Sequence, residues 1–385
     1  MTIKRWAVVL TLVTAIVLSA TATAAVSPHN AATQPHQGDI VEVKVGTVPV
    51  MIFAPLFVAD AKGYFADENL VVAILRNPGG SEPLAPLATG ELDVVMGGAG
   101  AGLFNYAKRN LDLENDPGFR IVAGVHSESD PLTSPLVVSA ERFENGEITS
   151  VADLEGGRVA INAPGAATEY WMAQALASEG LTLDDVELVA VAFPDVAAAL
   201  NSDSADRIDA AILGEPLVSF AEQEGLVVRL SEDFVDDFQA TFLYMSNDFI
   251  ANNREAAVGF IRAYVRAVRD LADNDAWASD ETAAILEEYT QVPAAINQTA
   301  ARPYFPINGE VDIKDLSTLQ DYFLAKGDLS YEEPLDIEVM IDNTLLEEVI
   351  ADIGAIETED KDSEEMEDDM EDDMGDEATE EPSEG

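Results

Sequence analysis

Three turns rich in glycine and other small residues are the strongest candidates for a binding site. They are Gly79-Gly80-Ser81, Gly97-Gly98-Ala99-Gly100 and Pro164-Gly165-Ala166-Ala167-Thr168, and each follows a predicted strand and opens a predicted helix. Small side chains let a ligand reach the backbone, and the first amides of a helix lie free at the positive end of its dipole. One such turn is usually only a tight turn. Three in register predict a site for an oxyanion or a polar edge that needs no charged side chain.

Aromatic and basic side chains lie close to these turns. Phe53 opens one predicted helix, and Tyr170 and Trp171 lie in the first turn of another. A flat ligand can stack on such rings, although ordinary packing explains each of them equally well. Arg76, at a strand end, could hold an anion, but a solvated surface arginine is the simpler interpretation.

Catalytic chemistry has few candidates. Of three histidines, only His126 lies in the predicted globular part, and a lone histidine is more often structural or exposed than catalytic. There is no G-x-S-x-G, H-E-x-x-H or P-loop motif. Asp209 and Glu215 stand near strand ends as polar contacts, and capping or turn roles explain Asp209 better than Glu215. The sequence therefore predicts no catalytic residue, no metal site, no cofactor and no enzymatic activity.

Acidic residues dominate the composition. The 385 residues include 73 acidic and 20 basic side chains, for a formal net charge of -53. A field of that sign repels nucleic acid and anionic lipid, so neither is an expected partner. The chain has no cysteine, which excludes disulfides, thiolate metal sites and a lipobox-type lipid anchor.

The N-terminus resembles an export signal over residues 1–25. Lys4 and Arg5 precede an apolar run, and small-x-small cleavage sites follow at residues 20–24. A retained anchor is the alternative, because the apolar stretch is just long enough to span a bilayer. Either interpretation places the remainder outside the cytoplasm, in a periplasm or on the outer face of the membrane.

Predicted strands and helices alternate between residues 40 and 356. The predicted strands cover residues 41–48, 71–75, 93–96, 120–125, 136–139, 158–161, 186–191, 209–213 and 241–246. This alternation indicates α/β architecture with parallel sheets covered by helices, and its restart near residue 151 suggests a second sheet. The linker 26–39 and the acidic tail 357–385 are expected to be disordered, with calcium or partner binding as the alternative for the tail.

Several segments, in this order and spacing, resemble the nitrate/sulfonate/taurine class of ABC-importer binding proteins, the group with the SsuA/THI5-like domain. They are Val45-Gly46, Pro55–Ala59, Gly63–Phe65, Glu68–Val72, Gly79–Ser81, Leu87–Asp93, Asp153–Ala160, Pro164–Ala166, Gly180-Leu181, Asp185-Val186, Ile208–Ala211, Glu215-Pro216, Gly327–Leu329 and Ile341-Asp342. The resemblance spans nearly the whole chain after the export signal.

The resemblance implies a type II periplasmic-binding-protein fold, with two α/β lobes, a two-crossing hinge and a ligand cleft between them. Lobe 1 would comprise residues 40–134 plus 243–356 and lobe 2 residues 135–242, with crossings near Ser134 and Leu243. Family contacts carried over to this sequence, together with Tyr170, give the predicted ligand-binding residues Pro49, Met51, Phe53, Gly79, Gly80, Ser81, Gly98, Ala99, Gly165, Ala166, Ala167, Thr168, Tyr170 and Glu215.

The implied function is capture of a small molecule by hinge closure and its delivery to the permease and ATPase subunits of an importer. The chain would act as a monomer on nitrate, a sulfonate or taurine, or a heterocycle like a thiamine precursor. A sensing surface protein without transport is the alternative. Another is an enzyme of the same fold acting on a pyrimidine-like substrate, which would need cysteines and an active-site histidine that are not found here.

The acidity of the globular part leads to a prediction about salt. A surface adapted to strong brine is one explanation, because at about 1 M salt the Debye length falls to roughly 3 Å and screens the repulsion. We expect the melting temperature, followed by circular dichroism, to be higher in molar sodium chloride than in dilute buffer. Equal melting temperatures in the two solutions would contradict this explanation.

Overall fold

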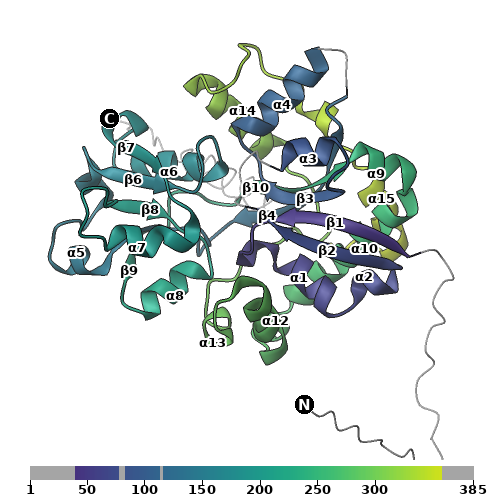
Figure 1. Ribbon diagram of the computed structural model, residues 1–385, viewed down its shortest axis with the longest axis horizontal. Helices are drawn as coiled ribbons and strands as arrows, with labels where there is room; N and C mark the ends of the chain where they lie inside the picture. The colour runs from purple at the N-terminus through teal and green to yellow at the C-terminus, as the bar shows by residue number, and fades with distance from the viewer. Residues whose placement is uncertain (1–39, 78–82, 113–115, 358–385) are drawn as a thin grey trace, which may run out of the picture. The chain divides into compact units, whose positions relative to one another are not determined.

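The structure, a computed structural model, describes residues 40–77, 83–112 and 116–357 (Figure 1). The predicted export signal, the linker 26–39, nearly all of the acidic tail and the turn Gly79–Ser81 therefore lie outside the described residues. Within the described ranges, no helix is long and apolar enough to cross a membrane.

The first of two mixed sheets has the strand order β2-β1-β3-β10-β4. Its strands are β1 (Val41–Thr47), β2 (Leu70–Arg76), β3 (Val94–Gly98), β4 (Phe119–Glu128) and β10 (Phe238–Ser246). β1 runs parallel to β2 and β3, whereas β10 is antiparallel to both β3 and β4. Because β3 extends to Gly98, the pair Gly97-Gly98 belongs to a strand and not to the predicted turn.

The second sheet has the order β7-β6-β8-β5-β9. It contains β5 (Leu136–Ser139), β6 (Arg158–Ile161), β7 (Glu187–Ala190), β8 (Ala210–Ile212) and β9 (Val227–Ser231). β6 is parallel to β7 and β8, and β5 is antiparallel to β8 and β9. The prediction of two α/β sheets is thus confirmed, but the prediction that they are parallel is wrong.

The mixed direction follows from where the chain crosses between sheets. It leaves β4 at the carboxyl end and enters β5 through residues 129–135, and it returns from β9 to β10 through residues 232–237. Each entering strand starts at the edge where the parallel strands end, so it must run against them. The return precedes Phe238, earlier than the crossing predicted near Leu243, and the division into two lobes stays a prediction.

Helices cover the sheets and form the core. α1 (Ala54–Ala61), α2 (Tyr64–Asp67), α10 (Arg254–Ala272), α12 (Asp280–Thr290) and α15 (Thr344–Ile353) pack together beside the first sheet (Figure 1). α10 buries Phe260, Tyr264 and Val268, whose spacing puts them on one face of the helix. The predicted helix from Phe53 to Lys62 is split into a 3₁₀ turn at Met51–Phe53 and α1.

A second core cluster includes residues of both sheets, among them Val95, Leu136 and Phe242, together with Tyr170 from a helix. Its helices include α3 (Leu84–Ala88), α4 (Ala101–Asp112), α6 (Ala167–Ala177) and α14 (Ile313–Lys326). The remaining helices are α5 (Ala140–Glu144), α7 (Val196–Leu200), α8 (Leu217–Gln223), α9 (Asn247–Asn252), α11 (Asn274–Trp277) and α13 (Ala294–Asn297).

Asp315 joins α14 to the start of β10. Its Oδ2 accepts a hydrogen bond of 2.7 Å from the Gln239 amide, and the side chain is almost fully buried. Burial raises the pKa of Asp315 from its ordinary value to about 6, with the Gln239 hydrogen bond acting in the opposite direction. Between roughly pH 4 and 6 the native state therefore binds more protons here than the unfolded chain does.

This carboxyl makes stability depend on pH. Its favourable contribution to the free energy of unfolding is present at low pH and is lost as the pH rises through the pKa of Asp315 in the folded state. Asp315→Asn cannot ionise but keeps an acceptor for the amide, so we expect it to be more stable than the parent at pH 7.5 and nearly equal at pH 4. Urea unfolding at constant salt measures the difference, with Asp321→Asn on the exposed face of α14 as the control. A difference independent of pH would contradict the prediction.

Candidate ligand-binding cavity

A cavity lies between the two sheets, at the edge where their parallel strands end. It contains about 820 Å³ of empty space, which includes its opening to solvent. Segments that follow strand ends line it in both sheets, among them Val48, Asn77 and Asn162. Ligands of open α/β sheets bind at this edge, so the cavity is where the topology places a site.

The strand register builds one wall of the cavity. β10 pairs with β3 and β4 so that Thr241 lies opposite both Gly98 and His126. All three residues line the cavity. The antiparallel strand therefore places a hydroxyl group between a glycine, which offers only backbone, and an imidazole.

Three aromatic side chains contribute further walls: Phe53, Trp171 and Phe193. Phe53 belongs to the segment after β1, and Trp171 to α6. The Trp171 ring meets Phe238 edge to face, with centroids 5.5 Å apart. Rings contributed by elements of both sheets can enclose a flat molecule.

His126, Thr133 and Glu128 form a buried hydrogen-bonded chain. The Thr133 hydroxyl lies 3.0 Å from both the Nε2 of His126 and the Oε2 of Glu128. Since a carboxylate only accepts, the single hydroxyl proton goes to Glu128, and His126 donates from Nε2. Burial lowers the pKa of His126, against the opposing charge of Glu128, so the imidazole is neutral at physiological pH.

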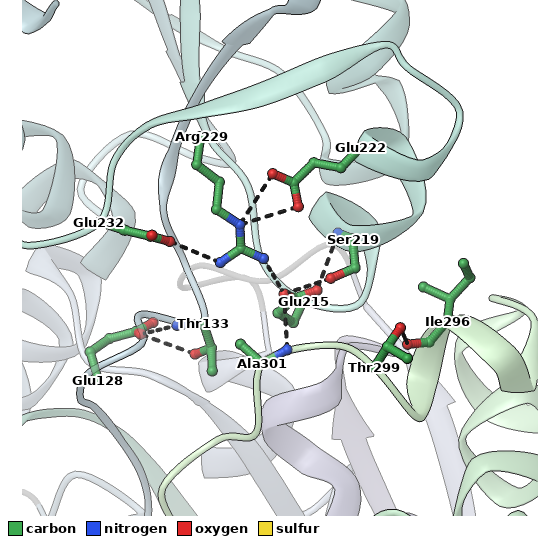
Figure 2. Close-up of polar contacts among 10 residues, drawn as sticks. All are labelled: Glu128, Thr133, Glu215, Ser219, Glu222, Arg229, Glu232, Ile296, Thr299 and Ala301. Atoms are coloured by element: carbon green, nitrogen blue, oxygen red, sulfur yellow. Dashed lines mark hydrogen bonds and ion pairs between the residues drawn. The ribbon is translucent and has the colours of Figure 1, made fainter.

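Glu215 has the most elaborate surroundings of any carboxylate in the cavity (Figure 2). It is fully buried, and its Oε1 accepts from Arg229 at 2.6 Å, from the Ser219 hydroxyl at 2.9 Å and from the Ala301 amide at 3.2 Å. Burial raises its pKa, while Arg229 and these hydrogen bonds oppose the rise. All of these partners belong to the protein. Glu215, which the sequence predicts as a ligand contact, therefore forms an internal ion pair with Arg229.

We call each sheet with the helices that cover it one half of the protein. Close contacts join these two halves around the cavity. The Ala101 amide donates to the Gly165 carbonyl at 2.9 Å, and the Met51 amide donates to the Glu215 carbonyl at 3.0 Å. Lys326 on α14 forms an ion pair of 2.7 Å with Glu169 on α6. We call the facing segments Gly98–Ala101 and Gly165–Ala167 the seam.

The seam requires glycine at residue 100. A Cβ added to Gly100 would lie 2.2 Å from the Gly165 carbonyl oxygen, far inside van der Waals contact. The glycine-rich turns therefore let the two halves approach each other.

Six of the predicted contacts line the cavity: Phe53, Gly98, Ala166, Ala167, Thr168 and Glu215. Five others do not: Pro49, Met51, Ala99, Gly165 and Tyr170. Met51 and Tyr170 are buried in the two cores, and Tyr170 packs against Phe238 and Tyr322. Gly79, Gly80 and Ser81 fall outside the described residues.

Three backbone amides in or beside the predicted turns are engaged within the protein. The Ala99 amide donates to the Ala240 carbonyl at 2.8 Å, and that of Ala101 donates across the seam. At the start of α6, the Gly165 amide donates to the Glu169 carboxylate at 2.8 Å. The chain thus supplies its own negative charge at this helix N-terminus.

The sequence interpretation missed Glu128, Asn162, Phe193 and Thr241 as cavity residues. Two signals were present. Glu128 follows His126 by two residues, so both side chains leave the same face of a strand. Asn162 directly follows β6 as Asn77 follows β2, so the same residue type stands at the carboxyl end of a parallel strand in each sheet. Of the other polar candidates, Arg76 donates to the Tyr289 carbonyl, and Asp209 pairs with Arg142 outside the cavity.

Two mixed α/β sheets, two crossings and a cavity between the sheets define the periplasmic-binding-protein class of fold. The solved nitrate-binding protein NrtA of Synechocystis has this fold, with a TM-score of 0.66 at 16% identity over 81% of this chain and 89% of that one. The ligand-binding component of an ABC-type import system from Staphylococcus aureus gives 0.62 at 14% identity, over 80% and 98%.

Residues 36–287 match the NMT1-like family, and the chain belongs to that family. The riboflavin-binding protein RibY of Chloroflexus aurantiacus is 26% identical over 292 residues, which cover 73% of this chain and 78% of RibY. These relatives are binding proteins, and the comparisons support a solute-binding role.

The seam can be tested by cross-linking, because the chain has no cysteine of its own. A Cβ added at Gly98 would lie 3.3 Å from the Cβ of Ala167, near the roughly 3.5–4.5 Å of a disulfide. We expect the double variant Gly98→Cys/Ala167→Cys to form a disulfide under mild oxidation, seen as faster migration on a non-reducing gel.

Two further variants act as controls. Pairing Gly98→Cys with Ala177→Cys, at the other end of α6 and roughly 15 Å along the helix, should give no cross-link. Adding Gly100→Ala to the reactive pair should suppress the cross-link, because the new methyl group keeps the seam apart. Unchanged cross-linking with Gly100→Ala would show that the seam does not close as described.

Proposed function

We propose that this chain is the exported solute-binding component of an ABC importer, and that it captures a small planar organic molecule. The cavity between the two sheets carries the proposal, because Phe53, Trp171 and Phe193 line it from elements of both sheets. A ligand that contacts both sheets stabilises their closed arrangement by its greater affinity for that arrangement. The permease would then recognise the closed form.

The two crossings supply the proposed hinge. Residues 129–135 include Thr133, which holds Glu128, and residues 232–237 follow Arg229, which holds Glu215. The first crossing therefore begins directly after Glu128. The second begins at Glu232, which pairs with Arg229, the partner of Glu215. A monomer that acts with permease and ATPase subunits outside the cytoplasm is the arrangement we propose.

We further propose that the ligand is bound without conversion. His126 is the single imidazole lining the cavity within the described residues, and its Nε2 is committed to Thr133. Recovery of the chemically unchanged ligand after long incubation is the expected result. A product that accumulates with time would instead favour an enzyme on this fold.

A ligand screen tests solute capture. We expect planar nitrogen heterocycles to raise the melting temperature in molar salt more than taurine or alkanesulfonates do, since a ligand at about 100 times its dissociation constant adds roughly 2.7 kcal/mol. Trp171→Ala should weaken binding of a hit roughly tenfold, because one stacking face is lost. Phe143→Ala, an exposed aromatic outside the cavity, should not.

The same screen can contradict the proposal. A set of heterocycles, nitrate and sulfonates of which none shifts the melting temperature would count against solute capture. Loss of uptake on deletion of the gene would separate transport from a purely sensing role.

A further inference from the structure

We infer that the ligand carries a positive charge and that Glu128 is the residue that pairs with it. The inference rests on the proposed function and specifies its ligand class as a planar organic cation, such as a nitrogen heterocycle that is protonated or alkylated on the ring. The argument depends on the difference between the two carboxylates of the cavity.

Glu128 is a buried carboxylate that pairs with no cation among the described residues. It is 2% exposed and lines the cavity. Its Oε2 accepts from the Thr133 amide at 2.8 Å and from the Thr133 hydroxyl at 3.0 Å. Among the described residues no lysine or arginine forms an ion pair with it, while Glu215 is paired with Arg229 at 2.6 Å. Burying an unpaired charge is costly, so a partner from outside the protein would relieve that cost.

The neighbouring histidine does not supply the missing charge. His126 is neutral for the reason given above, and it reaches Glu128 only through the Thr133 hydroxyl. Ser134, Asn162 and Thr168, which also line the cavity, are uncharged. Within the described residues, the cavity therefore keeps one carboxylate without a compensating cation.

In the described lining of this cavity, an oxyanion would lack a cationic side chain as a partner. The described lining residues include no lysine or arginine. Glu169 already occupies the start of α6, and the amides of Ala99 and Ala101 donate within the protein. An anionic ligand would therefore place a second uncompensated charge near Glu128.

A cation meets favourable groups on several sides. Phe53 and Trp171 line the cavity, and an aromatic ring that presents its face attracts positive charge through its quadrupole. The formal net charge of -53 raises the local concentration of cations when salt is low. The charge of the cavity and its aromatic lining are therefore both complementary to a flat cation.

Three nearly isosteric rings separate charge from shape: 1-methylnicotinamide (cation), nicotinamide (neutral) and nicotinate (anion). Calorimetric titration of the full exported chain at pH 7.5 and constant salt is expected to rank the cation first, the neutral ring at least roughly tenfold weaker and the anion last. Glu128→Gln keeps an acceptor for the Thr133 amide. This substitution should weaken binding of the cation roughly tenfold or more and change binding of nicotinamide far less.

The control is Glu224→Gln, which removes the same charge from an exposed position outside the cavity and should leave the ranking unchanged. If Glu128→Gln weakens the binding of all three rings equally, Glu128 does not pair with the ligand's charge and its role is structural. Tighter binding of nicotinate, nitrate or taurine than of the cation would overturn the charge assignment while leaving solute capture intact. If none of the three rings binds the parent protein, the assigned ligand class is overturned, whereas solute capture itself is tested separately by the wider melting-temperature screen described above.

Discussion

The carboxylate of Glu215 has to be satisfied inside the protein, because its side chain has no exposed surface. Its partners come from two directions. Arg229 and Ser219 belong to the second sheet and its helix α8, whereas Ala301 adjoins Ala300 and Phe305 in the core of the first sheet. The Glu215 carbonyl also accepts from Met51. Separating the halves would remove acceptors from two amides, so the closed arrangement is coupled to one buried charge.

The two carboxylates that line the cavity, Glu215 and Glu128, have different roles. Arg229 is itself shared with Glu222 and Glu232, so the positive charge beside Glu215 is held in a fixed network (Figure 2). Among the residues that the structure describes, the Glu128 side chain accepts only from the amide and hydroxyl of Thr133, at the first crossing. A full set of partners makes Glu215 a structural element. The incomplete set at Glu128 makes that residue available to a ligand and sensitive to movement of the crossing.

Local pattern predicted the elements of the fold well, because Val41–Thr47 alternates valine with polar residues and Arg158–Ile161 is a short, mostly buried run. It did not predict strand direction. The antiparallel placement of β5 and β10 depends on which edge the chain enters, and that is set by the other sheet. For the site, Phe53 and Thr168 could be found from position relative to strand ends. Thr241 and Phe193 could not, because their place in the cavity depends on register and on the approach of the second sheet.

The glycine-rich turns illustrate how one sequence signal can serve two physical purposes. Glycine at a strand end exposes backbone, and that backbone can be offered to a ligand or to another part of the chain. Around Gly100 the second use prevails, since the Gly165 carbonyl occupies the space where a side chain would begin and accepts from Ala101. The Ala101 amide, at the start of α4, is thereby engaged in closing the cavity. What remains facing the ligand is aromatic surface, hydroxyl and amide groups and one unpaired carboxylate, a set that suits a flat molecule able to bring positive charge.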